Sequence, residues 1–346
     1  MTVRVDTPSE LEIPFGAPAE PEAFKARGHW ELVWIRFRRD KLAVASFGFI
    51  IFLFLVAFAG APLAAHLLGH GPDDQFLAGG VNPLTQIPVG PWTHVTLAPY
   101  TGAKGHFGHT IFILGGDSVL GRDLFLRLIY GAQTSLEVAV FATIGAVGLG
   151  VIMGLLAGYL RGWVDTVVSR LVEIVMVFPF LLFIIALRIV AGPSLNSITL
   201  GFLKPGVFTL SVIFAGFGWF YPCRIMRGIV LSLREKEFVE AARMTGASDA
   251  RIMRSHLLPH LVAPIVVYSS LIVAQNIIAE AGLSFLGLGI DLPTPSWGNL
   301  LSEGPNYLTT QPWLMLWPGL AILLTTLAFN LLGDGLRDAF DPRSKI

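Results

Sequence analysis

The chain has 346 residues, of which 53% are hydrophobic and only 14% are charged, and its formal net charge is zero. Because soluble domains carry roughly 25% charged residues, this composition indicates a polytopic membrane protein. The neutral balance gives no reason to expect a nucleic-acid partner. The single cysteine, Cys223, excludes an internal disulfide and a cysteine-based metal cluster.

The first 41 residues form two segments of different composition. Residues 1–24 are rich in Pro, Glu and Ala without periodicity, which predicts a disordered cytoplasmic leader. In residues 25–41, Trp30, Trp34 and Phe37 are interspersed with basic side chains. This pattern is typical of an amphipathic helix on the inner membrane surface, but it equally suits a basic flank that only orients the first span.

Six apolar stretches are long enough to cross a bilayer core of about 30 Å, which takes about 20 helical residues. They lie at 42–65, 134–158, 167–189, 208–230, 261–281 and 314–333. The first begins too far from Met1 for a cleaved signal peptide, so we expect an uncleaved anchor. Residues 42–346 are therefore predicted to form an all-α domain of six transmembrane helices, with short structure in the outer loop 66–133.

The basic residues predict the orientation of these spans. Most of the 24 Lys and Arg residues lie in or beside the N-terminal segment, the loops after the second and fourth spans, and the tail. Cytoplasmic segments of membrane proteins carry an excess of Lys and Arg. Both termini and residues 234–260 are therefore expected in the cytoplasm.

A charged amphipathic stretch at 238–260 separates the fourth and fifth spans. Good helix formers occupy 235–244, Gly246 can adopt the left-handed conformation that ends a helix, and Ser248 or Asp249 can cap the next helix. The pattern predicts two short helices joined by a glycine turn. Its arginines would also suit a loop that only enforces topology. The ordered spacing of Glu-Ala-Ala at 240–242, Gly246 and Leu-Pro at 258–259 instead favours a docking element.

This stretch resembles the coupling segment of ABC-importer permeases, which docks into a separate ATPase. The positions that carry the likeness are Glu240, Ala241, Ala242, Gly246, Leu258 and Pro259. His256, where an apolar residue is more usual, is typical of the oligopeptide, dipeptide and nickel branch. Three further segments are similar to the C-type permeases of that branch, at 121–132, 280–298 and 329–338.

The resemblance implies a type I ABC-importer permease fold in the cytoplasmic membrane of a bacterium or archaeon. It also implies a heterodimer with a second homologous permease, two cytoplasmic ATPases and an extracytoplasmic solute-binding protein. ATP and Mg²⁺ would be bound by the ATPases and no cofactor by this chain, which contains no Gly-x4-Gly-Lys-Ser/Thr phosphate loop. The implied cargo is a di- or oligopeptide, and nickel or another small solute is the alternative.

Polar residues inside the spans are expected to face the protein interior or a water-filled path, because a charge in the bilayer is costly. The candidates are Arg188, Asn276 and Glu280. Arg188 and Glu280 lie near the outer ends of their spans, and a structural pair between them is favoured over recognition of peptide termini. Closely spaced glycines in the second span allow tight helix packing, within this chain or against another subunit.

Two other classes of protein fit less well. A secondary transporter would show internal repeats and ion-coupling carboxylates at mid-membrane. An intramembrane enzyme would need Ser with His, paired Asp or metal ligands within its spans. The sequence has none of these arrangements and no His-Glu-x-x-His motif. We therefore expect a transport subunit without catalytic or metal-binding residues.

Overall fold

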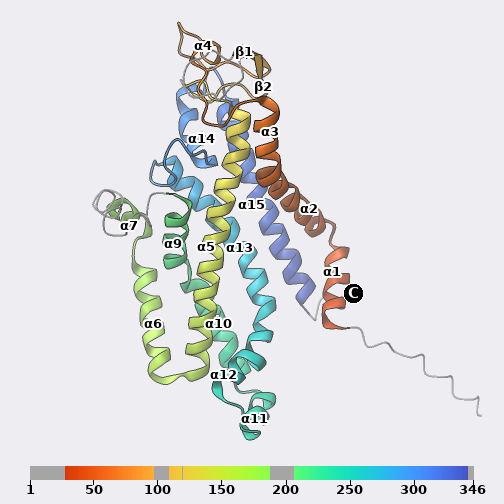
Figure 1. Cartoon of the computed structure of the whole chain (residues 1–346). Coiled ribbons are helices and arrows are strands. Elements are labelled where there is room, and N and C mark those ends of the chain that lie inside the picture. Colours follow the sequence, from red (N-terminus) through yellow and green to blue (C-terminus); the bar gives the residue numbers. More distant parts are fainter. Residues whose placement is uncertain (1–27, 97–108, 119, 188–205, 342–346) are drawn as a thin grey trace, which may run out of the picture.

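Four long helical runs form the body of the molecule (Figure 1). The computed structural model describes residues 28–96, 109–118, 120–187 and 206–341. The runs that are long and apolar enough to cross a membrane are Lys41–Leu68, Leu124–Leu160, Asp249–Phe285 and Trp313–Phe340. Two bent helix pairs bring the number to six if each pair is one span. In chain order these six elements overlap the six predicted stretches, although Leu124–Leu160 begins ten residues before the stretch predicted at 134–158.

The N-terminal flank forms a helix, α1 (His29–Arg39), that packs on the end of α15 (Trp313–Phe340). Val33 and Phe37 are buried against Ala339, and Arg36 donates a hydrogen bond of 2.7 Å to the carbonyl oxygen of Asp341. Trp34 stacks on Phe37 and is exposed at the edge of this packed face. A position on the membrane surface remains a prediction for this helix.

The first span contains a break in its hydrogen-bond pattern. The side chain of Asp40 caps α2 (Lys41–Leu55) by accepting from two backbone amides. A π-helical turn, η1 (Val56–Gly60), leads into α3 (Ala61–Leu68) directly before Pro62. Proline has no N–H and its ring clashes with the carbonyl four residues earlier, so a widened turn relieves that conflict.

The central helix is α5 (Leu124–Leu160), which packs against α9 (Val207–Gly218), α10 (Phe220–Leu233) and α13 (Leu258–Phe285). Glycines make the close approach to α10 possible. A Cβ at Gly154 would lie 2.7 Å from the carbonyl oxygen of Cys223, and Gly150 and Gly158 are equally crowded. These glycines therefore pack within this chain, whereas Gly148 meets no atom within 4 Å.

Two predicted spans are broken helices. The stretch at 167–189 begins as α6 (Gly162–Val177) and turns by 75° into α7 (Phe180–Ala186), and Arg188 lies outside the described residues. Phe178 is extended because it precedes Pro179. The stretch at 208–230 bends by 42° where α9 ends at Gly218 and α10 begins. Pro222 has no N–H to donate to the Gly218 carbonyl oxygen, and its ring clashes with that carbonyl group.

An outer layer covers one end of the bundle and includes a small β-hairpin (Figure 1). Strands β1 (Thr93–Thr96) and β2 (His109–Phe112) pair antiparallel next to α4 (Leu77–Gly80). Phe76, Val95 and Phe112 form its small core. The same layer contains α14 (Trp297–Glu303) and the short helix η4 (Gly304–Tyr307). The body is helical as predicted, and the hairpin lies within residues 66–133.

Buried charges fasten this layer to the start of α5. Asp117 Oδ2 lies 2.9 Å from Arg122 Nη2 and 2.6 Å from Arg127 Nε, and Arg122 Nη2 lies 2.9 Å from Glu303 Oε1. Burial works against the charge of Arg122, but Asp117 and Glu303 outweigh it, so the pKa of Arg122 is raised. Burial, with Asp117, raises the pKa of Glu303 despite both arginines. This network anchors the turn at residues 121–123 to the outer layer.

Candidate functional site

The loop between α10 and α13 forms a compact knob at the end of the molecule opposite the hairpin (Figure 1). The knob comprises α11 (Glu237–Met244), a turn, α12 (Asp249–Arg251) and the π-helical segment η3 (Ile252–Leu257). It corresponds to the predicted pair of short helices. The first helix begins at Glu237, two residues later than expected, because α10 runs on to Leu233.

A glycine sets the turn of the knob. Gly246 has φ of 78° and donates a hydrogen bond of 2.9 Å to the Arg243 carbonyl oxygen. Ala247 N donates to the Ala242 carbonyl oxygen at 3.0 Å, which completes a Schellman motif. No atom lies within 4 Å of a Cβ built on Gly246, so the left-handed backbone alone requires glycine. The predicted conformation is confirmed.

One face of the knob is packed and the other is free. Val239 and Ala242 are buried against Ile252, Leu257 and Leu261. Among the other motif residues, Glu240, Ala241 and Pro259 are exposed, while Leu258 is half-buried. The exposed motif residues are therefore available to a partner, and the buried ones hold the two short helices together.

Tyr159, at the end of α5, fixes the knob to the bundle. Its hydroxyl donates a hydrogen bond of 2.6 Å to Asp249 Oδ1, and the Arg243 guanidinium lies 5.4 Å from its ring centroid. The ring packs with Met226 and Val230 of α10. Sequence reasoning did not find this role, because a tyrosine at the end of a span is usually interfacial.

Two ion pairs join the helices around the base of the knob. Arg227 of α10 makes a bidentate contact with Asp165 of α6, at 2.5 and 2.7 Å. On the surface, Arg161 pairs with Glu235. These pairs connect the α5–α6 corner with α10 at the base of the knob.

The polar residues predicted inside the spans lie far from the knob. Asn276 donates to Thr143 Oγ1 at 3.0 Å, across the α13–α5 interface. Glu280 is fully buried, and its two carboxyl oxygens accept hydrogen bonds of 2.7 Å from Ser135 and Ser284. Each oxygen of the Glu280 carboxyl group is thus hydrogen-bonded to a serine hydroxyl. The pair between Glu280 and Arg188 stays a prediction, because Arg188 lies outside the described residues.

Known proteins share both the sequence and the fold. Residues 150–346 match the family described as binding-protein-dependent transport system inner membrane component, and residues 28–81 match the N-terminal TM domain of oligopeptide transport permease C. The chain belongs to this permease family. The predicted family, fold and role as a transport subunit of an ABC importer are thereby confirmed.

Individual relatives extend the match over most of the permease. A glutathione transport system permease protein of Pectobacterium atrosepticum is 35% identical over 92% of this chain and 93% of its own length. A dipeptide transport system permease protein of Alkalihalophilus pseudofirmus is 41% identical over 66% of this chain and 72% of its own length.

A solved structure supports the fold of the permease. A chain from inward-facing conformations of the MetNI methionine ABC transporter superposes with a TM-score of 0.50 at 18% identity, over 63% of this permease and 98% of that chain. As a binding-protein-dependent component, the permease is a multi-pass inner-membrane protein that works with an ATPase and a binding protein.

Proposed function

We propose that this permease forms one half of the membrane path of an ATP-driven importer of short peptides, and that residues 234–260 dock a cytoplasmic ATPase. The observation that carries the docking assignment is the two-sided knob, in which Glu240 and Ala241 are exposed while Val239 and Ala242 are buried. The peptide assignment rests on relatives named for dipeptide and glutathione transport.

In this proposal the knob works as a lever. A rigid-body movement of the ATPase displaces α11 through its exposed face. The buried face of α11 and the Tyr159–Asp249 hydrogen bond transmit the displacement to α5 and α10. Because proteins switch between discrete packed arrangements, the spans would rock between inward-open and outward-open states rather than deform continuously.

The proposed assembly has a second homologous permease, two ATPases and an extracytoplasmic solute-binding protein, all within or beside the lipid bilayer. Both termini and the knob lie on the cytoplasmic side, and the hairpin and α14 face the binding protein. ATP and Mg²⁺ are bound and ATP is hydrolysed in the ATPases, so this permease supplies the path and the lever.

Reconstitution of the complete importer into proteoliposomes tests the proposal. We expect radiolabelled di- or tripeptide to accumulate only when both permeases, the ATPases, the binding protein and ATP are present. Uptake that persists without an ATPase would contradict the docking role. Accumulation of ⁶³Ni²⁺ instead of any peptide would support the assignment as an ATP-driven importer and reject the assignment of a peptide cargo.

A further inference from the structure

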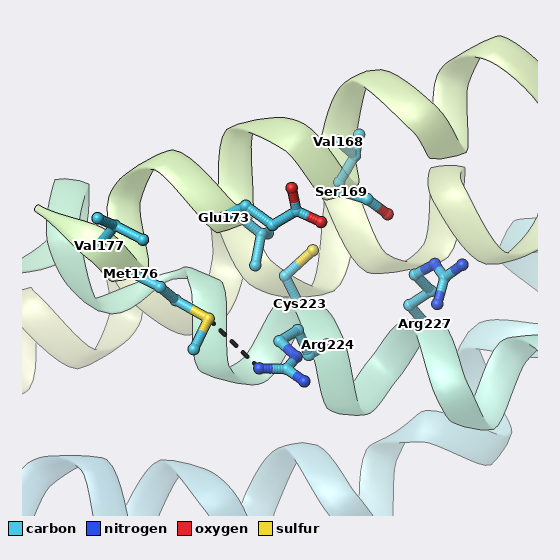
Figure 2. Close-up of a pocket in the computed structure, with 9 residues that line it drawn as sticks. Val168, Ser169, Glu173, Met176, Val177, Cys223, Arg224 and Arg227 are labelled. Carbon is cyan, nitrogen blue, oxygen red and sulfur yellow. Dashed lines mark hydrogen bonds between the residues drawn. The ribbon is translucent and has the colours of Figure 1, made fainter.

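A hollow groove lies between α6 and α10 (Figure 2). Its volume is about 490 Å³, and its walls combine apolar side chains such as Val172 with Glu173, Arg224 and Arg227. Two spans that only packed together would be expected to close such a gap with apolar side chains. Instead the groove is open and carries charges of both signs.

The charges of the groove lie in the cytoplasmic part of the predicted spans. Arg224 precedes the cytoplasmic end of the predicted span 208–230 by six residues, which is about 9 Å at 1.5 Å per residue. Glu173 lies about 9 Å inside the predicted span 167–189 by the same reasoning. With a hydrocarbon core of about 30 Å, both residues lie inside the core, on its cytoplasmic side.

Arg224 makes a weak contact where a strong one is expected. Arg227 is already held by Asp165, and Glu173 pairs with Arg170 at 2.6 Å. Among the described residues, the recorded hydrogen-bond partner of Arg224 is the sulfur of Met176, at 3.3 Å from Nη1 (Figure 2). A thioether is a weak acceptor. An exposed guanidinium at this depth therefore has spare donors for an anionic group.

We propose that this groove is a contact site for the peptide in the translocation path, where Arg224 binds the terminal carboxylate of the peptide. A guanidinium binds a carboxylate through two parallel hydrogen bonds. A phospholipid phosphate would offer similar chemistry, but it lies at the headgroup level, about 9 Å closer to the cytoplasm than Arg224. Glu173 and Val177 also border a second hollow at the α6–α7 bend. This inference rests on the proposed peptide transport.

Photo-crosslinking in the complete reconstituted importer tests the site directly. A benzophenone amino acid replaces Met176 in the groove, or Leu171, which lies on the same helix, is exposed and does not line the groove. We expect radiolabelled tripeptide to attach to position 176 during turnover with ATP and loaded binding protein, and not to position 171. If the variant at 176 fails to assemble, Val177, which also lines the groove, takes its place. Equal labelling of groove and control positions, or lipid adducts alone at the groove position while peptide is imported, overturns the proposal.

A substitution series separates recognition from coupling. Arg224→Gln is expected to lower peptide uptake about tenfold or more, with ATP hydrolysis stimulated by loaded binding protein kept within about twofold of wild type. Arg224→Lys, which keeps the charge, should restore part of the uptake, and Arg39→Gln on α1 serves as the control for loss of an exposed arginine. If the Arg224→Gln importer takes up peptide as fast as wild type, the proposed peptide site is rejected while the proposed peptide transport stands. Failure of the wild-type importer to take up any peptide rejects the peptide assignment and the site together.

Discussion

Gly246 is the residue that sets the shape of the knob, since its φ of 78° turns the chain between α11 and α12. Gly246→Ala is expected to cost about 1–2 kcal/mol of backbone strain and to leave transport largely intact, because the space around a Cβ is open. Gly246→Pro cannot adopt the turn, since proline holds φ near −65°, and it also removes the N–H that bonds to Arg243.

Uptake and binding-protein-stimulated ATP hydrolysis, measured for both Gly246 variants after reconstitution, distinguish these effects. We expect Gly246→Pro to insert into the membrane yet lose peptide uptake, while Gly246→Ala retains most of it. A Gly246→Pro importer that couples like wild type would show that the turn is dispensable.

Tyr159 links the knob to α5 through one hydrogen bond to a carboxylate, an interaction worth about 1.5–3 kcal/mol. Tyr159→Phe removes the bond and keeps the ring. We expect the melting temperature of the purified complex to fall by a few degrees and stimulated ATP hydrolysis to fall with it. Tyr221→Phe is the matched control, because its hydroxyl donates no hydrogen bond among the described residues. An unchanged melting temperature for Tyr159→Phe would contradict the linking role.

The sequence predicts residues whose role depends on local chain geometry better than those whose role depends on distant partners. The turn at Gly246 follows from helix formers before it and the conformational freedom of glycine, and it is confirmed. Glu280 could be recognised as a buried charge, but its partner Ser135 is 145 residues away on α5. Nothing local in the sequence identifies that contact.

At the scale of elements, composition locates each span but does not show where it bends. Pro264 and Pro318 lie inside continuous helices, whereas Pro222 coincides with the α9–α10 break. The difference lies in the surroundings: Pro222 follows Gly216 and Gly218, which weaken the helix before it. Mean hydropathy does not register such a local weakening of the helix, so it predicts one continuous span for each of the two broken ones.

Close packing of α5 on α10 gives a prediction with a control in the same helix. Gly154→Ala would place a Cβ 2.7 Å from the Cys223 carbonyl oxygen, so the helices must separate. We expect a cost of about 1–3 kcal/mol and less folded protein in the membrane, measured as the melting temperature and yield of the purified complex. Gly148→Ala meets no atom within 4 Å and should match wild type. Equal stability of the two variants would contradict the packing.

At the scale of the whole molecule, the distribution of basic residues predicts which end faces the cytoplasm. Cys223 is first replaced by Ala, and single cysteines are placed at Ser248 in the knob or at Thr309 beyond α14, both of which are exposed. An impermeant thiol reagent added to intact cells should label position 309 and leave 248 unlabelled until the membrane is opened. Labelling of 248 from outside would invert the topology.

The central claim is that the knob couples this permease to an ATPase, and charge reversal at its exposed face tests it most directly. The measurement is the stimulation of ATP hydrolysis by loaded binding protein in the reconstituted importer, with peptide uptake followed in parallel. Reversal of an interfacial charge typically costs enough to lower coupling about tenfold or more. We predict this loss for Glu240→Lys, whereas Glu31→Lys, an exposed reversal on α1, should behave as wild type. Full stimulation and uptake in a correctly assembled Glu240→Lys importer would contradict the account.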